Sequence, residues 1–428
     1  MTSANFCAID FGTSNSAIAL PAADGVSLVE LEPSHRTMPT AVFYAVEHAH
    51  EELSCHYGRA ALSAYIDGLD GRLMRSMKSL LGSSLIEHST DVGGGRAVPY
   101  VEVIAGYLRH LKRLAEAEAG GPLRRAVLGR PVFFVDDDPQ RDAQAQATLE
   151  DAARSVGFEE VAFQYEPIAA ALDFERQAQR EQRVLVADIG GGTSDFSIVR
   201  VGPKRAGRVD RKDDILANHG VHIAGTDFDR RVELAAVLPS CGYRAMGPSE
   251  GAQPPREVPS RVYFDLATWH LINTVYGPAR VAELRRMRSF YADARLHQRL
   301  MRVVTERLGH ALIARAESAK IAVADGGATE IDLSLIEDGL VLPLDGQEAA
   351  DAVEVDLQRI VQAADDTLKL AALQPGQIDA LYFTGGSTGL TALTERIAAR
   401  FPDATVQRGD RFASVAQGLG VHAARHFR

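Results

Sequence analysis

The sequence has few of the features that mark disulfide-bonded or membrane-spanning proteins. Its 428 residues include only three cysteines, far apart and without a CxxC pair, which excludes a disulfide framework and favours a reducing compartment. No apolar run approaches the roughly 20 residues of a membrane span. The N-terminus also lacks the basic and apolar regions of a signal peptide. We therefore expect a cytoplasmic protein with no membrane partner.

Several well-known catalytic signatures are missing as well. The chain has neither a GxxxxGK[ST] phosphate loop nor a GxGxxG motif after a first strand, and its 13 histidines form no HExxH or Cys/His cluster. The formal net charge of −11 argues against nucleic acid as a partner. The hydrophobic content of 46% is ordinary for a globular protein, and the length predicts two or more domains.

What the sequence does contain is a glycine-rich turn between two apolar runs, VLVADIGGGTSDFSIVRV at residues 184–201. This pattern predicts a β-hairpin. Its glycines allow main-chain N–H groups to face an anion, and the oxygens of Asp188 and Asp195 suit a hydrated Mg²⁺. The stretch therefore indicates phosphate and magnesium, although glycine-rich hairpin turns also occur without any ligand.

The same device occurs at the start of the chain. The stretch AIDFGTSNS aligns with ADIGGGTSDFS once two extra glycines of the later copy are skipped, so that Asp10 matches Asp188 and Asn15 matches Asp195. An internal repeat on this scale predicts two similarly built halves, each presenting a phosphate-binding hairpin to a shared cleft. The duplication favours a nucleotide as the ligand.

The remaining pattern predicts alternating helices and strands. A strand is expected over residues 379–384, and helices are expected over 59–81, 100–118, 261–300 and 413–427. The three glycines at 93–95 lie in a polar stretch, and we expect a loop there without flanking strands.

The strand at 379–384 runs into TGGSTG and a helix, a pattern with two interpretations. In α/β proteins such a junction binds phosphate or ribose near the helix N-terminus. The glycines around Ser387 also fit the nucleophile elbow of serine hydrolases. The order of a hydrolase triad would then be completed by Asp403 or Asp410 and by His422 or His426. The hydrolase interpretation leaves both acidic hairpins unexplained, so the nucleotide interpretation is favoured.

Four motifs in this order, AIDFGTSNS, EPIAAAL, DIGGGTSD and TGGSTG, resemble the phosphate-1, connecting, phosphate-2 and adenosine motifs of actin-like ATPases. Within that superfamily the chain is similar to the DnaK-type heat-shock chaperone ATPases. The phrases GRPVFF, FQYEPIAAALDFE and GPKR resemble their short YegD-like branch. The resemblance implies an α/β, actin-like (ribonuclease H-like) duplicated fold of two lobes, each with a mixed sheet flanked by helices.

The resemblance also implies a domain plan. A first lobe with the phosphate-1 hairpin is expected over residues 1–183, and a second lobe with the phosphate-2 hairpin over 184–382, with a helical insertion at 230–325. Residues 383–428 would carry the adenosine motif and the C-terminal helices that close the cleft. Because the chain stops at Arg428, the linker, peptide-binding domain and lid of the chaperones are not expected.

Each motif residue receives an implied role from the resemblance. Mg²⁺ would be held, partly through water, by Asp10, Asp188 and Asp195. The catalytic set, which would position the γ-phosphate and the attacking water, comprises Lys78, Glu166, Thr193 and Asp195. The phosphates of ATP or ADP would lie against Gly12, Thr13, Ser14, Asn15, Gly190, Gly191, Gly192 and Thr193. The nucleoside would lie against Gly225, Glu317, Lys320, Gly385, Gly386 and Ser387.

Some of these residues look ordinary without the resemblance. Lys78 is then a solvated lysine, and Glu317 with Lys320 is a common surface pair at i, i+3. Two positions also depart from the family pattern, because Gly389 replaces an arginine that stacks on adenine and Ala324 replaces a serine. Selectivity for the base therefore stays open.

The expected function is that of a slow Mg²⁺-ATPase whose nucleotide state switches its two-lobed shape for a partner protein or co-chaperone. Phosphoryl transfer is chiefly a matter of positioning and charge neutralisation, which suits the residue types in these motifs. An actin-like assembly protein and a small-metabolite kinase on the same fold are the alternatives.

Overall fold

The computed structural model describes residues 5–22, 25–46, 54–93, 95–249, 254–410 and 413–427. By its internal contacts the chain forms two compact units. Unit 1 consists of residues 1–220, 363–386 and 398–428, and unit 2 consists of 221–362 and 387–397. The boundaries of these units differ from the lobe boundaries at residues 183 and 382 that the resemblance implies. The division into those lobes stays a prediction.

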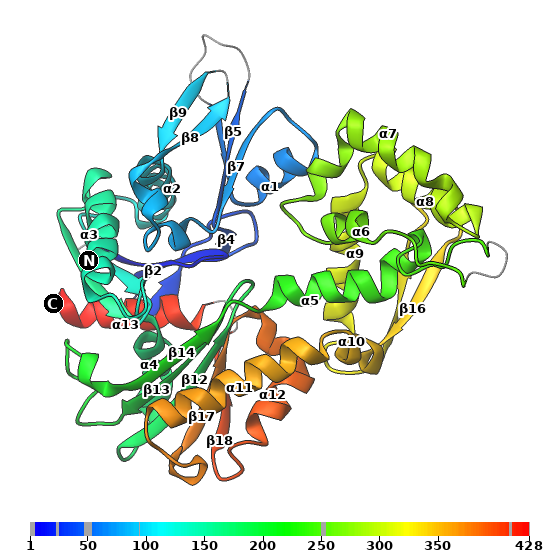
Figure 1. Ribbon diagram of the computed structural model, residues 1–428. Helices are drawn as coiled ribbons and strands as arrows, with labels where there is room; N and C mark the ends of the chain where they lie inside the picture. The colour runs from blue at the N-terminus through cyan, green and yellow to red at the C-terminus, as the bar shows by residue number, and fades with distance from the viewer. Residues whose placement is uncertain are drawn as a thin grey trace. The chain divides into compact units, whose positions relative to one another are not determined.

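Unit 1 contains two sheets with the same strand order, and Figure 1 labels the strands β12, β13, β14, β17 and β18 of the second. The first sheet runs in the order β3 (Gly25–Leu28), β2 (Asn15–Ala22), β1 (Phe6–Phe11), β10 (Arg125–Arg130) and β11 (Glu160–Tyr165), with β4 (Thr37–Pro39) also paired to β2. The second runs in the order β14 (Ile215–Val221), β13 (Ser194–Val201), β12 (Gln182–Ile189), β17 (Ala380–Thr384) and β18 (Thr405–Arg408).

Strand directions repeat along with strand order. In each sheet the hairpin, β1–β2 or β12–β13, is antiparallel, and the two strands beyond its first strand pair in parallel. The duplication predicted from the two glycine-rich turns therefore extends over five strands of each sheet. Mixed sheets built twice in this way confirm the predicted fold class.

Two helices with small residues lie between the sheets of unit 1. Helix α4 (Glu166–Gln177) presents the buried alanines Ala169, Ala170 and Ala171, which share a core cluster with residues of both sheets. Helix α13 (Ser414–His426) packs on α4 and on β1, and Figure 1 shows α13 beside α4. The approach is so close that a Cβ on Gly418 would lie 1.9 Å from the carbonyl oxygen of Ala169.

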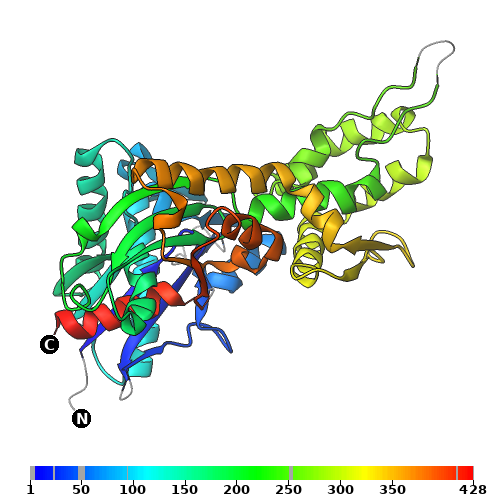
Figure 2. The same ribbon diagram turned by 90° about the horizontal axis from the view of Figure 1, so that it is seen from below.

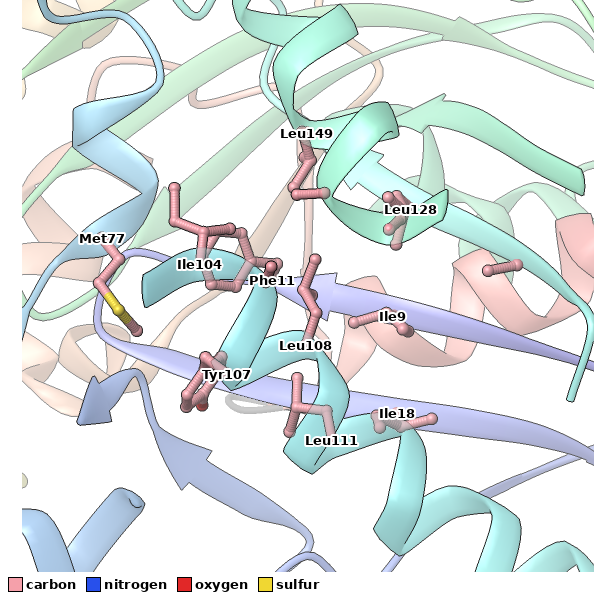
Figure 3. Close-up of a cluster of buried hydrophobic side chains, with 14 of the residues drawn as sticks. Ile9, Phe11, Ile18, Met77, Ile104, Tyr107, Leu108, Leu111, Leu128 and Leu149 are labelled. Carbon is pink, nitrogen blue, oxygen red and sulfur yellow. The ribbon is translucent and has the colours of Figure 1, made fainter. Parts of the chain in front are cut away.

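The opposite face of the first sheet is covered by α2 (Tyr100–Ala119) and α3 (Pro139–Ser155). Side chains alternate between the two faces of a strand, so Ile9 and Phe11 of β1 join this second core while Ala8 joins the cluster with α4 and α13. Figure 3 shows the larger side chains around Leu108 of α2 filling this core. Bulky residues on one face and small ones on the other thus position the hairpin turns.

Unit 2 is mainly helical. Its helices include α5 (Gly225–Val232), α6 (Arg261–Leu266), α7 (Pro278–Arg286), α8 (Ala294–Thr305), α9 (Gly309–Ala322), α10 (Gly346–Ala352), the first half of α11 (Glu354–Leu370) and most of α12 (Thr391–Ala398). The antiparallel hairpin of β15 (Ala328–Asp332) and β16 (Val341–Asp345) lies beside α9 (Figure 2). After α5 the chain continues as a π-helical turn, Glu233–Val237.

Three local expectations were wrong. The stretch at 59–81 is helical only in α1 (Gly58–Ile66), and it continues as the strand β7 (Gly71–Arg75) and a 3-10 turn. Strand β7 pairs with β5 (Ala41–Ala45), which also pairs with β6 (Ser54–Tyr57). The stretch at 261–300 is broken into α6, α7 and α8. Two paired strands, β8 (Ser89–Gly93) and β9 (Arg96–Pro99), flank the glycine run at 93–95, of which residue 94 lies outside the described residues. Burial alternates along β8, and a strand of five residues is too short to stand out in a polar sequence.

The contact between α4 and α13 leads to a prediction about stability. Gly418→Ala is expected to lower the free energy of unfolding by about 1–3 kcal/mol, since the added methyl group meets backbone that cannot move without opening the helix pair. Gly207→Ala is the matched control, because a Cβ there meets nothing within 4 Å. Urea denaturation of both variants measures the difference, and a Gly418→Ala variant as stable as the wild type contradicts this packing account.

Candidate nucleotide site

The two glycine-rich turns come together in unit 1. Asp10 and Asp188 lie near the ends of β1 and β12, just before the turns that lead into β2 and β13. A Cβ on Gly191 of the second turn would lie only 2.8 Å from Ser14 Oγ of the first turn. The structure therefore brings the tips of both predicted hairpins into contact.

The first turn is anchored by Thr40. Its hydroxyl donates to the carbonyl oxygen of Gly12 at 2.8 Å, and its backbone N–H donates to the carbonyl oxygen of Ser14 at 2.9 Å. In a trans peptide the N–H points away from the carbonyl of the same unit. The N–H groups of Thr13 and Asn15 are thereby turned away from Thr40, as binding an anion requires.

Lys78 and Glu166 form an ion pair beside the turns. Lys78 lies in the 3-10 turn Met77–Leu80 with only 8% of its surface exposed, and its ammonium donates to Glu166 Oε1 at the first residue of α4. Burial by itself lowers the pKa of Lys78, but the carboxylates of Glu166, Asp10 and Asp195 outweigh it, and the pKa is raised. The lysine is therefore a buried, charged group and not the solvated surface residue that it resembles in the sequence.

Negative charge is in excess around this lysine. Burial, followed by the charge of Glu166, raises the pKa of Asp10 to about 8, against the opposing effect of Lys78. Burial, followed by the charges of Asp195 and Glu166, raises the pKa of Asp188 to about 7. Among the described residues, Lys78 is the cation that acts on the pKa values of both Asp10 and Asp188, and negative charge is in excess around it.

Strand register adds to this repulsion. Asp188 of β12 pairs directly with Asp195 of β13. Like charges that face each other across an antiparallel pair destabilise the sheet. Glycines allow the chain to pass close to both carboxylates, since a Cβ on Gly385 would lie 2.7 Å from Asp188 Oδ1 and one on Gly220 would lie 2.4 Å from Asp195 Oδ1.

The cluster suits a hydrated divalent cation better than a bare one. Within the described part of the chain, no group of three or more His, Cys, Asp or Glu side chains is arranged to hold a metal ion directly. Mg²⁺ usually keeps several of its waters and uses only one or two carboxylates. The charge deficit and the oxygen donors of Asp10, Asp188 and Asp195 fit that mode of binding.

The residues predicted for the nucleoside are distributed over both units. Gly385 and Gly386 belong to unit 1, where Gly385 follows β17 with a φ of +87°. Unit 2 holds Gly225, Glu317, Lys320 and Ser387. Lys320 of α9 does not pair with Glu317 as the sequence spacing suggested. Its ammonium lies 2.5 Å from Asp229 Oδ1 and 3.4 Å from the carbonyl oxygen of Gly225.

Sequence reasoning missed two residues of this arrangement, Thr40 and Asp229. Thr40 acts across the fold on a turn 28 residues earlier, and no motif marks it. Asp229 had a signal, because it follows Gly225 by one helical turn in GTDFDRRV and so lies on the same helix face. The remaining phosphate-side candidates lie in or beside the two turns, although their individual roles stay predictions.

A separate cavity of about 610 Å³ lies in unit 1, between β6, α1 and α2. Its lining includes Leu31, Glu32, Met38, Tyr57, Arg59 and His110. None of the predicted phosphate-site residues lines it, so the cavity belongs to another part of the unit.

Comparison with known proteins identifies the class. The Hsp70 protein family model matches residues 6–236, more than half of the chain, and the chain belongs to this family. The ATPase domain of Hsp70 proteins has the actin-like fold, in agreement with the duplicated sheets described above.

Two bacterial relatives show the extent of the similarity. The chain is 35% identical over 227 residues to the chaperone protein DnaK of Thermotoga neapolitana and 34% identical over 229 residues to that of Thermosipho melanesiensis. Each match covers 52% of this chain and 34% of the relative, so the chain spans about a third of the length of these proteins. No helix in the described ranges is both long enough and apolar enough to cross a bilayer.

The charge cluster leads to a prediction for the magnesium-free protein. The raised pKa of Asp10 means that folding disfavours its ionised form, so this residue contributes less stability as pH rises from about 4 to about 8. Asp10→Asn is expected to be about 1–3 kcal/mol more stable than the wild type at pH 9 in EDTA and no more stable at pH 4.

Denaturant unfolding at both pH values measures this effect, and added Mg²⁺ should reduce the advantage of Asp10→Asn by stabilising the wild type more than the variant. Asp403→Asn, a change in a different part of unit 1, is the control and should show neither effect. An Asp10→Asn variant that is destabilised equally at both pH values contradicts the charge account.

Proposed function

We propose that this protein binds Mg²⁺ and ATP, hydrolyses the ATP slowly, and serves as a chaperone-type nucleotide switch for a partner protein or co-chaperone. The observation that carries the proposal is the contact between two duplicated glycine-rich turns beside a buried Lys78–Glu166 pair. Membership of the Hsp70 family supports it independently.

The turns account for phosphate binding. Main-chain N–H groups of Thr13, Asn15, Gly192 and Thr193 would supply donors at fixed positions, and the hydroxyls of Thr13, Ser14 and Thr193 would add to them. Because Thr40 holds the first turn by its carbonyl groups, little reorganisation is needed when an anion binds.

Lys78 and Glu166 account for the chemistry. The ammonium of Lys78 stays charged beside four carboxyl groups and can neutralise oxygens of a transferring phosphoryl group. Glu166 fixes that ammonium, and a carboxylate has a second oxygen with which to orient a water. Thr193, just before β13, and Asp195, its second residue, would orient the same water from the other turn.

Asp10, Asp188 and Asp195 would hold a hydrated Mg²⁺. When bound, the ion would offset the negative charge of the cluster and of the phosphates. The nucleoside contacts of Gly225, Glu317, Lys320, Gly385, Gly386 and Ser387 belong to this proposal as well.

Lys78→Ala tests the catalytic assignment. We expect the steady-state turnover of ATP to fall by about 100-fold, because a preorganised charge opposite the reacting phosphoryl group is lost. The Kd of ADP should change much less, since the backbone donors of both turns are retained.

Lys204→Ala, at an exposed lysine after β13, is the matched control and should keep wild-type turnover. Single-turnover hydrolysis and equilibrium titration with ADP separate the two quantities. Retained turnover in pure Lys78→Ala protein would remove Lys78 from the mechanism.

A further inference from the structure

The cavity of about 610 Å³ in unit 1 has the size of a small-molecule site. Pockets that bind small molecules measure about 300–1,000 Å³, and they combine a mostly apolar lining with a few polar groups in fixed positions. The apolar part of this lining includes Leu31, Met38 and Leu114, and the polar part includes Glu32 and Arg59. None of the residues proposed above for the nucleotide belongs to the lining, so the cavity is a candidate site for a second ligand.

Two stacked rings form part of the lining. Tyr57 at the end of β6 and His110 of α2 have ring centroids 4.1 Å apart and ring planes that differ by only 9°. Burial, followed by the charge of Arg113, lowers the pKa of His110 to about 4, so this imidazole is uncharged at neutral pH. An uncharged wall of aromatic rings favours contact with a flat apolar ring.

Arg59 presents one edge of its guanidinium group to a ligand. Its Nη1 donates to Glu32 and, at 2.9 Å, to the carbonyl oxygen of Thr37, and these two bonds fix the orientation of the planar group. Nε and Nη2, which share another edge, have no acceptor among the described residues, and the side chain is 42% exposed. Two parallel N–H bonds on one edge match the two oxygens of a carboxylate.

The polar groups around this edge are donors whose neighbouring acceptors are already in use. Glu32 Oε1 accepts the backbone N–H of Arg59 at 2.7 Å, and Glu32 Oε2 accepts from Arg59 Nη1. His110 supplies a further donor. Because an arginine side chain can only donate, the 3.4 Å contact with Arg113 Nη2 makes His110 Nδ1 the acceptor and leaves the imidazole proton on Nε2. The polar end of a ligand must therefore carry acceptors.

We propose that this cavity binds a small aromatic carboxylate, whose carboxylate lies on the Nε–Nη2 edge of Arg59 and whose ring lies against Tyr57 and His110. The guanidinium group keeps its positive charge, and Glu32 is bonded to a different nitrogen of it, so the edge is available to an anion. This inference goes beyond the proposed nucleotide switch and does not depend on it.

The test compares 2-naphthoate with its uncharged relative 2-naphthamide by equilibrium titration of the full chain. The wild type should bind the carboxylate about tenfold more tightly, the size expected for hydrogen bonds to a charged group. Arg59→Lys keeps the positive charge beside Glu32 but removes the paired N–H edge. It should bind 2-naphthoate about tenfold more weakly and 2-naphthamide equally well.

Arg124→Lys is the matched control, because Arg124 of unit 1 also pairs with a glutamate, Glu159, but lies outside the lining of the cavity. It should bind both compounds as tightly as the wild type does.

Cys55 reports where the compound binds. It lines the cavity and is half-buried, whereas Cys7 and Cys241 are fully buried. Alkylation of the folded protein by iodoacetamide therefore measures Cys55, and pH 9 suits this reaction because burial raises the pKa of the thiol. At a concentration ten times its Kd, 2-naphthoate should slow the alkylation about tenfold.

Equal binding of the two compounds by the wild type, or a folded Arg59→Lys variant that keeps the full preference, overturns the role of Arg59. Absence of binding, or binding that leaves the alkylation of Cys55 unchanged, overturns the site itself. If Arg59→Lys does not fold, the preference of the wild type and the protection of Cys55 still decide the proposal.

Discussion

The site depends on an imbalance of charge that the backbone imposes. Two hairpins of the same design bring Asp10, Asp188 and Asp195 to the neighbourhood of Glu166, and Lys78 is the cation that these groups share in the described part of unit 1. Such an arrangement is unfavourable by itself, as the raised pKa values of Asp10 and Asp188 indicate. Under the proposed function it would become favourable when a divalent cation and a polyanion bind together, and that would explain why the fold tolerates it.

Packing of the helices against the sheets holds the carboxyl groups of the two turns close together. Small residues on α4 and α13 let the two helices lie against both sheets, while bulky residues on α2 and α3 fill the other face of the first sheet. The turns therefore project from strands that are buried on both faces and cannot move apart to relieve the repulsion. Preorganisation of this kind is what a phosphate site needs, because donors already in position cost no rearrangement when charge develops.

Much of the fold and the pair of glycine-rich turns could be predicted from the sequence, because turn chemistry and duplication are local signals, while the role of the turns in phosphate binding stays a prediction. Asp10, Gly12, Asp188 and Gly190 stand out by spacing alone. Contacts between residues of different elements could not be predicted in this way. Thr40 donates a hydrogen bond to Gly12 of the first turn from a distant part of the sequence. Lys320 pairs with Asp229 of another helix, although the i, i+3 spacing within its own helix predicted a pair with Glu317. The β8–β9 hairpin was not predicted, because strands of four or five residues are too short to show a clear alternation of polar and apolar residues.

The most direct test of the central claim is a crystal structure of the protein with Mg²⁺ and ADP. The account predicts that the β-phosphate lies against both glycine-rich turns, with a hydrated Mg²⁺ beside Asp10 and Asp188. Bound ADP whose phosphates contact neither turn would contradict it.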